Sequence, residues 1–433
     1  MISRREALFS TLFGAGYVGL RALATGLPAS LLLNPRKALA DASMCVAQDK
    51  AQFIILNTLG SGDPINANVP GTYDDPMITH SADPTMVATP LTIQGQQYTA
   101  AAPWATLPQN VLDRTIFWHL MTNTPVHPKE PQVLQLMGAT QAGEMLPSLL
   151  AKQLAPCLGT IQPQPISVGA LTPSEALTYG GAALPVVPAL ALKATLTNPA
   201  GPLTTLQPLR DQTLNQIYDV YKTGANAAQR QYIDSLVTSQ TQVRNISQSL
   251  LNSLTSIKDN SAASQVLAAI TLIQMNVAPV ISIHIPFGGD NHRDIALATE
   301  TAQTVSGVAT IASLMSQLAS AGLQDKVTLI SLNVFGRTLG PTNTDGRQHN
   351  SNHQVSITIG KPFRGGVVGA VGPVGPDYGA SAIQSTTGAG NAGGDIHAVD
   401  SLAAFGQTML AAIGADPTVI TSATGKVVTS ALV

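Results

Sequence analysis

The sequence predicts one large α/β domain with a mostly parallel central sheet flanked by helices. Residues 279–335 have the pattern of a strand, a helix and a second strand with short connections, a unit that forces parallel pairing and a right-handed crossover. A further buried strand is expected at 53–59, where an apolar run ends on a glycine-rich turn. With 433 residues, 44% of them hydrophobic, the chain is long enough to bury a sizeable core.

The strand–helix–strand unit has the clearest pattern in the chain. Its strands are expected at 280–285 and 327–334 and its helix at about 294–320, with Gly322 in the left-handed conformation that ends many helices. Apolar residues at helical spacing predict the face of this helix that packs on the sheet: Val305, Val308, Ile311 or Ala312, Met315 and Leu318.

The remaining segments are less regular. Residues 70–205 are rich in Pro, Thr and Ala and are expected to form an irregular insertion, with short helices at 106–112 and 145–153. Apolar spacings of three and four then predict a helical segment at about 206–275, with two or three long helices. No period of about 20 to 50 residues repeats along the chain, which excludes solenoids and propellers.

The amino-terminal segment has the features of an export signal. Arg4 and Arg5 precede a moderately apolar stretch at 7–33, which closes on the small-x-small pattern Ala38-Leu39-Ala40. An amino-terminal membrane anchor is the alternative. Glycines, a proline and an arginine interrupt the apolar stretch, so a continuous span of about twenty apolar residues is missing and no stable transmembrane anchor is expected.

We therefore interpret residues 1–40 as a twin-arginine signal peptide. Such a signal is read by the twin-arginine translocation machinery, which exports proteins that have already folded. Cleavage near Ala40 would leave 41–433 as a single large domain, periplasmic or secreted.

The amino-acid composition limits the classes of partner that the protein is expected to bind. Lys and Arg number 22 against 24 acidic residues, which leaves no basic stripe for nucleic acid and no polybasic membrane patch beyond the signal. Charged residues are only 11% of the chain, so the surface depends on uncharged polar side chains. Cys45 and Cys157 lack metal-type spacing and form either one disulfide or two separate thiols; we favour the disulfide in an oxidising compartment.

Polar side chains follow the predicted strands at their carboxyl ends, where ligands bind in open α/β sheets. Asp63 follows the first strand, and the pair Asp290-x-His292 follows the second. His349 and His353 lie four residues apart in a polar segment after the third strand. Imidazole and carboxylate groups from several strand ends are suitable ligands for a divalent metal ion. A loop aspartate is also a common turn former or helix cap, so the spacing alone leaves both interpretations open.

The carboxy-terminal half resembles a known family. Its motifs occur in this order: Gly288-Gly289-Asp290-Asn291-His292, the long helix, Asn333-Val334-Phe335-Gly336-Arg337-Thr338, Gly346-Arg347-Gln348-His349, Asn352-His353 and the glycine-rich run 364–369. They are similar to those of a widespread family of exported bacterial proteins of unknown function, related to the alkaline phosphatase and sulfatase superfamily. The strand at 53–59 with Gly60-Ser61-Gly62-Asp63 resembles the family's first strand and turn.

The resemblance implies an alkaline phosphatase-like fold and a metal-facing set of five residues: Asp63, Asp290, His292, His349 and His353. Two positions depart from the family pattern, because Asn333 and Gln348 stand where the family has carboxylates. A carboxamide does not neutralise metal charge, and a two-metal centre would lack negative charge. We therefore expect one divalent ion, zinc, manganese or calcium, or none.

The superfamily attacks phosphorus or sulfur with a serine or threonine beside the metal. Ser61 is a candidate nucleophile, although a serine between two glycines is commonly a turn residue. Arg337 is a candidate for holding an oxyanion bidentately, and a buried structural ion pair explains it equally well.

Two functions from different classes follow. The first is a metal-dependent hydrolase of phosphate or sulfate esters, with a degenerate or single-metal site. The alternative is a non-catalytic exported binding or assembly protein on the same scaffold, because fold alone does not decide function. We favour the first.

Overall fold

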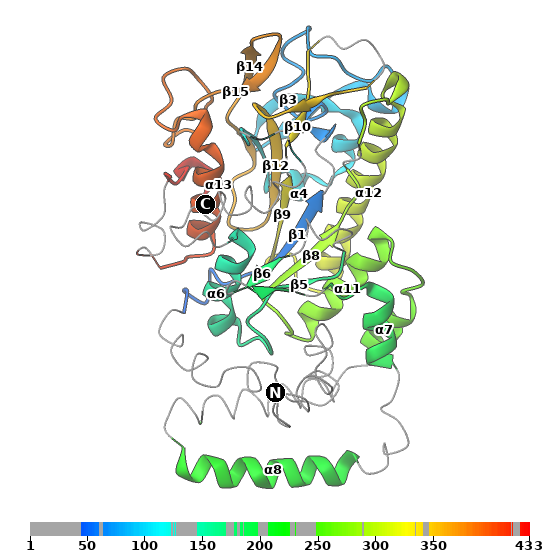
Figure 1. The fold of residues 1–433 in the computed structure, drawn as a ribbon, viewed down its shortest axis with the longest axis vertical. Coiled ribbons are helices and arrows are strands. Elements are labelled where there is room, and N and C mark those ends of the chain that lie inside the picture. Colours follow the sequence, from blue (N-terminus) through cyan, green and yellow to red (C-terminus); the bar gives the residue numbers. More distant parts are fainter. Residues whose placement is uncertain are drawn as a thin grey trace, which may run out of the picture.

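The computed structural model shows an α/β fold with a seven-stranded mixed sheet between helical layers (Figure 1). It describes residues 45–59, 64–122, 124, 126, 145–169, 177–179, 182–184, 186–197, 207–225, 230, 248–287, 290–333, 335–340, 346–416, 418 and 425–433. The predicted signal, the candidate Ser61 and the candidate Asp63 lie outside these residues.

The central sheet has the strand order β13-β4-β12-β9-β1-β8-β5. Its strands are β1 (Phe53–Leu59), β4 (Thr115–Leu120), β5 (Ile166–Ser167), β8 (Val280–His284), β9 (Val327–Asn333), β12 (Gln354–Ile359) and β13 (Gly366–Val368). Small two-stranded sheets are formed by β2 (Ala88–Ile93) with β3 (Gln96–Ala101), β6 (Thr178–Tyr179) with β7 (Ala182–Ala183), β10 (Gly336–Arg337) with β11 (His349–Asn350), and β14 (Val371–Val374) with β15 (Asp377–Ala380).

The first strand lies at the centre of the parallel part of the sheet. β1 pairs in parallel with β8 on one side and with β9 on the other, as the sequence predicts. β5 also runs parallel to β8, whereas β12 is antiparallel to both of its neighbours. The carboxyl ends of β1, β8 and β9 therefore lie at one edge of the sheet.

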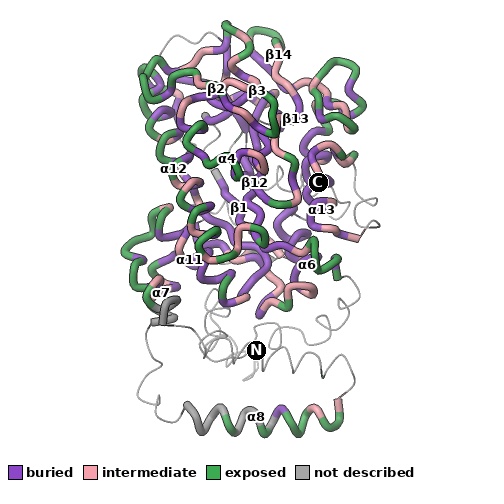
Figure 2. Tube along the Cα trace, turned by 180° about the vertical axis from the view of Figure 1, so that it is seen from behind, coloured by how far each residue is buried: buried purple, intermediate pink, exposed green. Residues whose placement is uncertain are grey.

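Helices cover both faces of the sheet (Figures 1 and 2). The described helices are α4 (Gln109–Leu112), α6 (Leu146–Leu158), α7 (Ala189–Thr197), α8 (Gln207–Gly224), α10 (Gln248–Thr255), α11 (Ala262–Gln274), α12 (Ala298–Ser320) and α13 (Ser401–Ala412), of which α8 lies apart from the sheet at the bottom of Figure 1. Side chains alternate along each strand, so Ile54 packs in one apolar cluster with α6 and α13, while Ile55 packs in a second cluster with α11 and α12.

Helix α12 is the predicted crossover helix, and a short 3-10 turn, η8 (Ile295–Leu297), precedes it. Val308, Ile311, Met315 and Leu318 are buried as expected. Val305 is 37% exposed, and Thr304 is buried in its place because the buried face is rotated by one residue at this turn. Gly322 has φ +67, which confirms the left-handed residue at the end of this helix.

The segment 70–205 contributes more regular structure than its composition indicates. β4 lies inside the central sheet, and β2 and β3 form a hairpin. The helix expected at 145–153 extends to Leu158, and the one expected at 106–112 is the short α4. The expected helical segment contains α8, α10 and α11.

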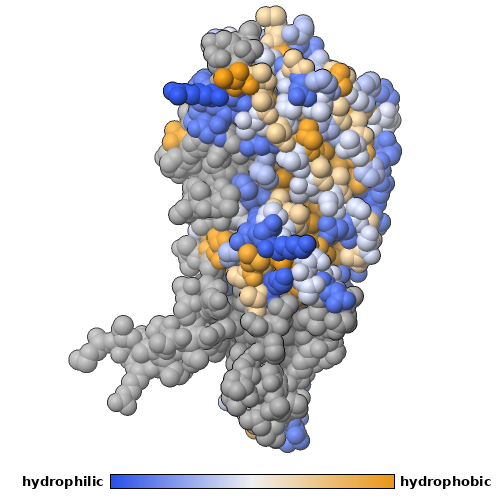
Figure 3. All heavy atoms as spheres, turned by 90° about the vertical axis from the view of Figure 1, so that its right-hand side faces the viewer, coloured by the Kyte–Doolittle hydropathy of each residue, from blue (hydrophilic) through white to orange (hydrophobic). Residues whose placement is uncertain are grey.

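Cys45 and Cys157 form a disulfide, with their Cα atoms 5.0 Å apart. This bond ties the chain before β1 to the end of α6. Among the described residues, no helix is long and apolar enough to cross a membrane. On the side where α12 lies, apolar and polar surface residues are interspersed (Figure 3).

Candidate metal and anion site

The site lies where the loops after β8 and β9 meet. Asp290 and His292 belong to the loop after β8, and Arg337 lies in β10, directly after β9. β10 pairs antiparallel with β11, which places Arg337 opposite His349. The strand ends thus bring together four of the residues predicted from the sequence.

Three possible ligand atoms lie close together at this edge. The Nε2 atoms of His292 and His349 are 2.8 Å apart, and Oδ1 of Asp290 lies 3.3 Å from Nε2 of His292. The side chain of His292 is 32% exposed and that of Asp290 is 63% exposed, so solutes can reach both. One carboxylate and two imidazoles form a ligand set suited to zinc or manganese, whereas calcium prefers oxygen ligands alone.

Gln348 fixes the orientation of the His292 ring. Its Oε1 atom lies 2.8 Å from Nδ1 of His292 and accepts that N–H. The lone pair of Nε2 in the neutral ring therefore points toward His349 and Asp290. Metal-binding histidines commonly donate their second ring N–H to an oxygen in this way.

The two imidazoles are hydrogen-bonded directly to each other. In the part of the chain that the structure describes, no three His, Cys, Asp or Glu side chains are already arranged around a common point as metal ligands. A metal ion bonds to imidazole nitrogen at about 2.0–2.1 Å. An ion at this site would therefore replace the proton shared between His292 and His349 and would require a small separation of the rings.

Arg337 brings a positive charge to the same point. Its side chain is fully buried, and one terminal nitrogen lies 3.4 Å from Nε2 of His292 and 3.7 Å from Oδ1 of Asp290. The guanidinium also lies 5.6 Å from the centre of the Phe335 ring. A guanidinium and a metal ion repel each other unless an anion lies between them. The arrangement is therefore suited to an anionic ligand.

His353 is not part of this group. Its Nε2 lies 2.8 Å from Nδ1 of His119, and its Nδ1 lies 3.2 Å from Nδ2 of Asn66. Both ring nitrogens are thus used in hydrogen bonds with other residues. Burial lowers the pKa of His119 to about 4, and burial together with the nearby His119 lowers the pKa of His353 well below its usual value. Both rings are neutral at pH 7.

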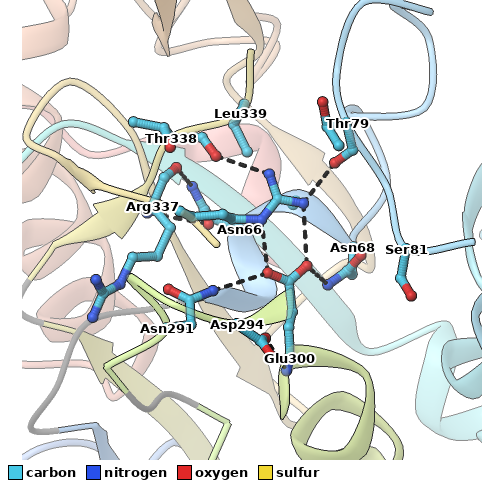
Figure 4. A network of polar contacts seen from close by, with 12 residues as sticks. Asn66, Asn68, Thr79, Ser81, Asn291, Asp294, Glu300, Arg337, Thr338 and Leu339 are labelled. Carbon is cyan, nitrogen blue, oxygen red and sulfur yellow. Dashed lines mark hydrogen bonds and ion pairs between the residues drawn. The ribbon is translucent and has the colours of Figure 1, made fainter. Parts of the chain in front are cut away.

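A buried ion pair next to the candidate site links the segments that carry its histidines (Figure 4). Both side chains of the pair Glu300–Arg347 are fully buried, with Nε of Arg347 2.7 Å from Oε2 of Glu300. Asn291 and Asn68 donate to the same carboxylate, at 3.2 and 2.9 Å. Because Asn291 precedes His292 and Arg347 precedes Gln348 and His349, this network links the backbones that carry both histidines.

The two carboxamides singled out in the sequence, Gln348 and Asn333, have different surroundings. Gln348 contacts His292, as described above. Asn333 is buried at the end of β9, where its amide donates to Oε1 of Gln354 at 3.0 Å and to the carbonyl oxygen of Val355. Asn333 therefore serves strand packing between β9 and β12.

Sequence reasoning missed His119 and the pair Glu300–Arg347. His119 lies within the continuous apolar run of β4, and Glu300 lies in the first turn of α12, where acidic residues are common at any helix start. The position of Arg347, directly before Gln348 and His349 in the sequence, was the one feature that could have indicated its role.

Comparison of the chain with protein-family models and with curated proteins gives no match.

Proposed function

We propose that this chain is an exported hydrolase of phosphate or sulfate esters that uses a single divalent metal ion, zinc or manganese. Asp290, His292 and His349 would bind the ion, and Arg337 would bind the anionic ester beside it. The observation that carries the proposal is that a second imidazole nitrogen, a carboxylate oxygen and a terminal nitrogen of a buried guanidinium all lie within 3.4 Å of Nε2 of His292.

Charge supports an anionic substrate. A divalent ion and Arg337 together outweigh the single negative charge of Asp290, so the described part of the site attracts an anion. When bound, the metal would act as a Lewis acid toward an ester oxygen. Arg337 has the planar fork that recognises two oxygens of phosphate or sulfate. His292 is held in one ring orientation by Gln348.

The carboxamides favour a second candidate function, a non-catalytic exported protein that binds an anion. Gln348 orients His292 without adding negative charge. Without metal, the N–H groups of the Arg337 guanidinium still lie beside the paired rings of His292 and His349 and could donate to an anion.

Turnover distinguishes the two functions. The purified mature protein is assayed with phosphate monoesters, phosphate diesters and sulfate esters, with zinc or manganese added. The hydrolase proposal predicts turnover of at least one ester class, and a loss of about a hundredfold or more in Arg337→Lys, because lysine cannot reproduce the bidentate contact. Arg114→Lys is the matched control, since Arg114 forms a surface pair with Asp325. Absence of turnover with every ester class would leave the binding function.

A further inference from the structure

A line of buried hydrogen bonds connects β4 to the backbone of Arg337. Nε2 of His119 lies 2.9 Å from the carbonyl oxygen of Pro70, and His119 and His353 are joined at 2.8 Å. His353 contacts Asn66, whose amide bonds the backbone of Arg337 on both sides. Nδ2 of Asn66 donates to the Arg337 carbonyl at 2.8 Å, and Oδ1 of Asn66 accepts from the Arg337 N–H at 3.3 Å.

The direction of every hydrogen bond in this line is determined. A carbonyl oxygen only accepts, so Nε2 of His119 carries the proton and Nδ1 of the neutral ring is an acceptor. Nε2 of His353 must then donate to His119, which leaves Nδ1 of His353 as an acceptor. That acceptor requires the NH₂ group of Asn66, and the amide orientation agrees with both of its bonds to Arg337.

We infer that Asn66, oriented by the buried pair His353 and His119, is a positioning residue that sets where the guanidinium of Arg337 lies in the anion site. The inference rests on the proposed function in that Arg337 is the group that receives the anion. Asn66 takes the place of a strand on the edge of β10 that is not paired with β11. Its amide offers one donor and one acceptor to the backbone of Arg337, as a neighbouring strand would.

The chain packs closely around both ends of this line of hydrogen bonds. A Cβ atom on Gly336 would lie 2.0 Å from the carbonyl oxygen of His353 and 2.8 Å from Nδ2 of Asn66. A Cβ atom on Gly71, which has φ +95, would lie 2.6 Å from Nε2 of His119. Asn66, His119, His353 and Arg337 are all fully buried. The line is therefore closely packed and shielded from water, and a change at His353 should reach Arg337 through Asn66.

A proton on Nδ1 of His353 would disrupt the sequence of donors and acceptors that runs from His119 to Arg337. The added N–H would face the NH₂ group of Asn66, and the amide would have to turn over to present its oxygen. The amide oxygen of Asn66 would then face the carbonyl oxygen of Arg337, and the NH₂ group would face the Arg337 N–H, so both hydrogen bonds would be lost. The neutral state of the two rings is thus part of what positions Arg337.

Histidine-selective ¹⁵N NMR on the wild-type mature protein tests the first step. Both His119 and His353 should be in the tautomer with the proton on Nε2 at pH 7, with ring protons that exchange slowly with solvent. The opposite tautomer at His353, or a positively charged ring, would overturn the inference.

Arginine NMR tests the second step without any ligand. The Nε–Hε signal of Arg337 is identified by its loss in Arg337→Lys. It should shift in Asn66→Asp, which replaces the NH₂ donor with a carboxylate oxygen, and in His353→Gln, a second variant in case the first does not fold. Asn276→Asp is the matched control, because the Nδ2 group of Asn276 also makes two hydrogen bonds, to the carbonyl oxygens of Leu158 and Gly159, away from the site. An unchanged Arg337 signal in the folded Asn66 or His353 variant contradicts the inference.

Inorganic phosphate is the functional probe. Asn66→Asp should weaken phosphate binding about tenfold or more, while Asn276→Asp keeps wild-type affinity. If wild type itself binds no phosphate, the proposed function fails while the NMR result still decides whether Asn66 positions Arg337. If wild type binds phosphate and Asn66→Asp binds it equally well, the positioning role is refuted and the proposed function stands.

Discussion

Arg337 and His349 face each other across the two-residue ladder of β10 and β11. This pairing connects the loop after β9 to the segment that carries His349, and it places a buried guanidinium beside the imidazole pair. A proposed metal ligand and the proposed anion-binding group thus lie on the same short ladder.

Gln348→Glu should strengthen metal binding. A carboxylate at Nδ1 of His292 makes the ring a better ligand than a carboxamide does, and changes of this kind commonly alter metal affinity by about 10- to 100-fold. Gln348→Ala should weaken binding by a similar factor. Zinc titration by calorimetry measures both. Equal affinities in wild type and the two variants would show that Gln348 does not support a ligand.

Glu300→Gln should lower the free energy of unfolding by about 3–5 kcal/mol, because it leaves the guanidinium of Arg347 buried without a counter-charge. Asp325→Asn is the control, since the pair with Arg114 is on the surface and should contribute about 0–1 kcal/mol. Urea unfolding monitored by circular dichroism gives both values. A loss at Glu300 no larger than at Asp325 contradicts the role assigned to the buried pair.

Stability should fall as pH is lowered from 7 to 4. The pKa of His119 is lowered from 6.5 to about 4 in the folded protein, so the unfolded chain takes up the proton first. The contribution is complete above pH 6.5 and is lost between pH 6.5 and 4, at about 1.4 kcal/mol for each pH unit of difference. His80, whose pKa is also lowered to about 4 by burial, acts in the same direction.

Urea unfolding at several pH values measures this dependence. His119→Gln should be less stable than wild type at pH 7 and should lose less stability on acidification. An identical pH dependence in the two proteins would show that His119 is not held neutral by the fold.

Gly336→Ala should destabilise the protein and disturb the site, because the added Cβ would meet the carbonyl oxygen of His353 at 2.0 Å. The expected loss is about 1–3 kcal/mol or more, as for other overpacked positions. Gly224→Ala is the control, since nothing lies within 4 Å of the added Cβ at that position. Thermal unfolding compares the two. Equal melting temperatures would contradict the close packing of β10 against His353.

The sequence predicts the parallel core of the sheet because β8, α12 and β9 follow one another with short connections and clear periodicity. β4 and β12 were not predicted, since their pairing joins residues more than 200 positions apart and depends on tertiary contacts. The order of the motifs along the sequence led to the prediction of Asp290, His292, Arg337 and His349 as site residues. No local pattern marks Asn66 or His119, because their role arises only when three separate segments meet around His353.

The most direct test of the central claim is the metal content of the purified mature protein. Mass spectrometry of metals should find one zinc or manganese ion per chain in the wild type and none in an Asp290→Ala, His349→Ala double variant. The exposed His397 supplies the control, and His397→Ala should keep the ion. Wild-type protein without stoichiometric metal, even after zinc and manganese are supplied, would contradict the metal site. So would a double variant that keeps the ion.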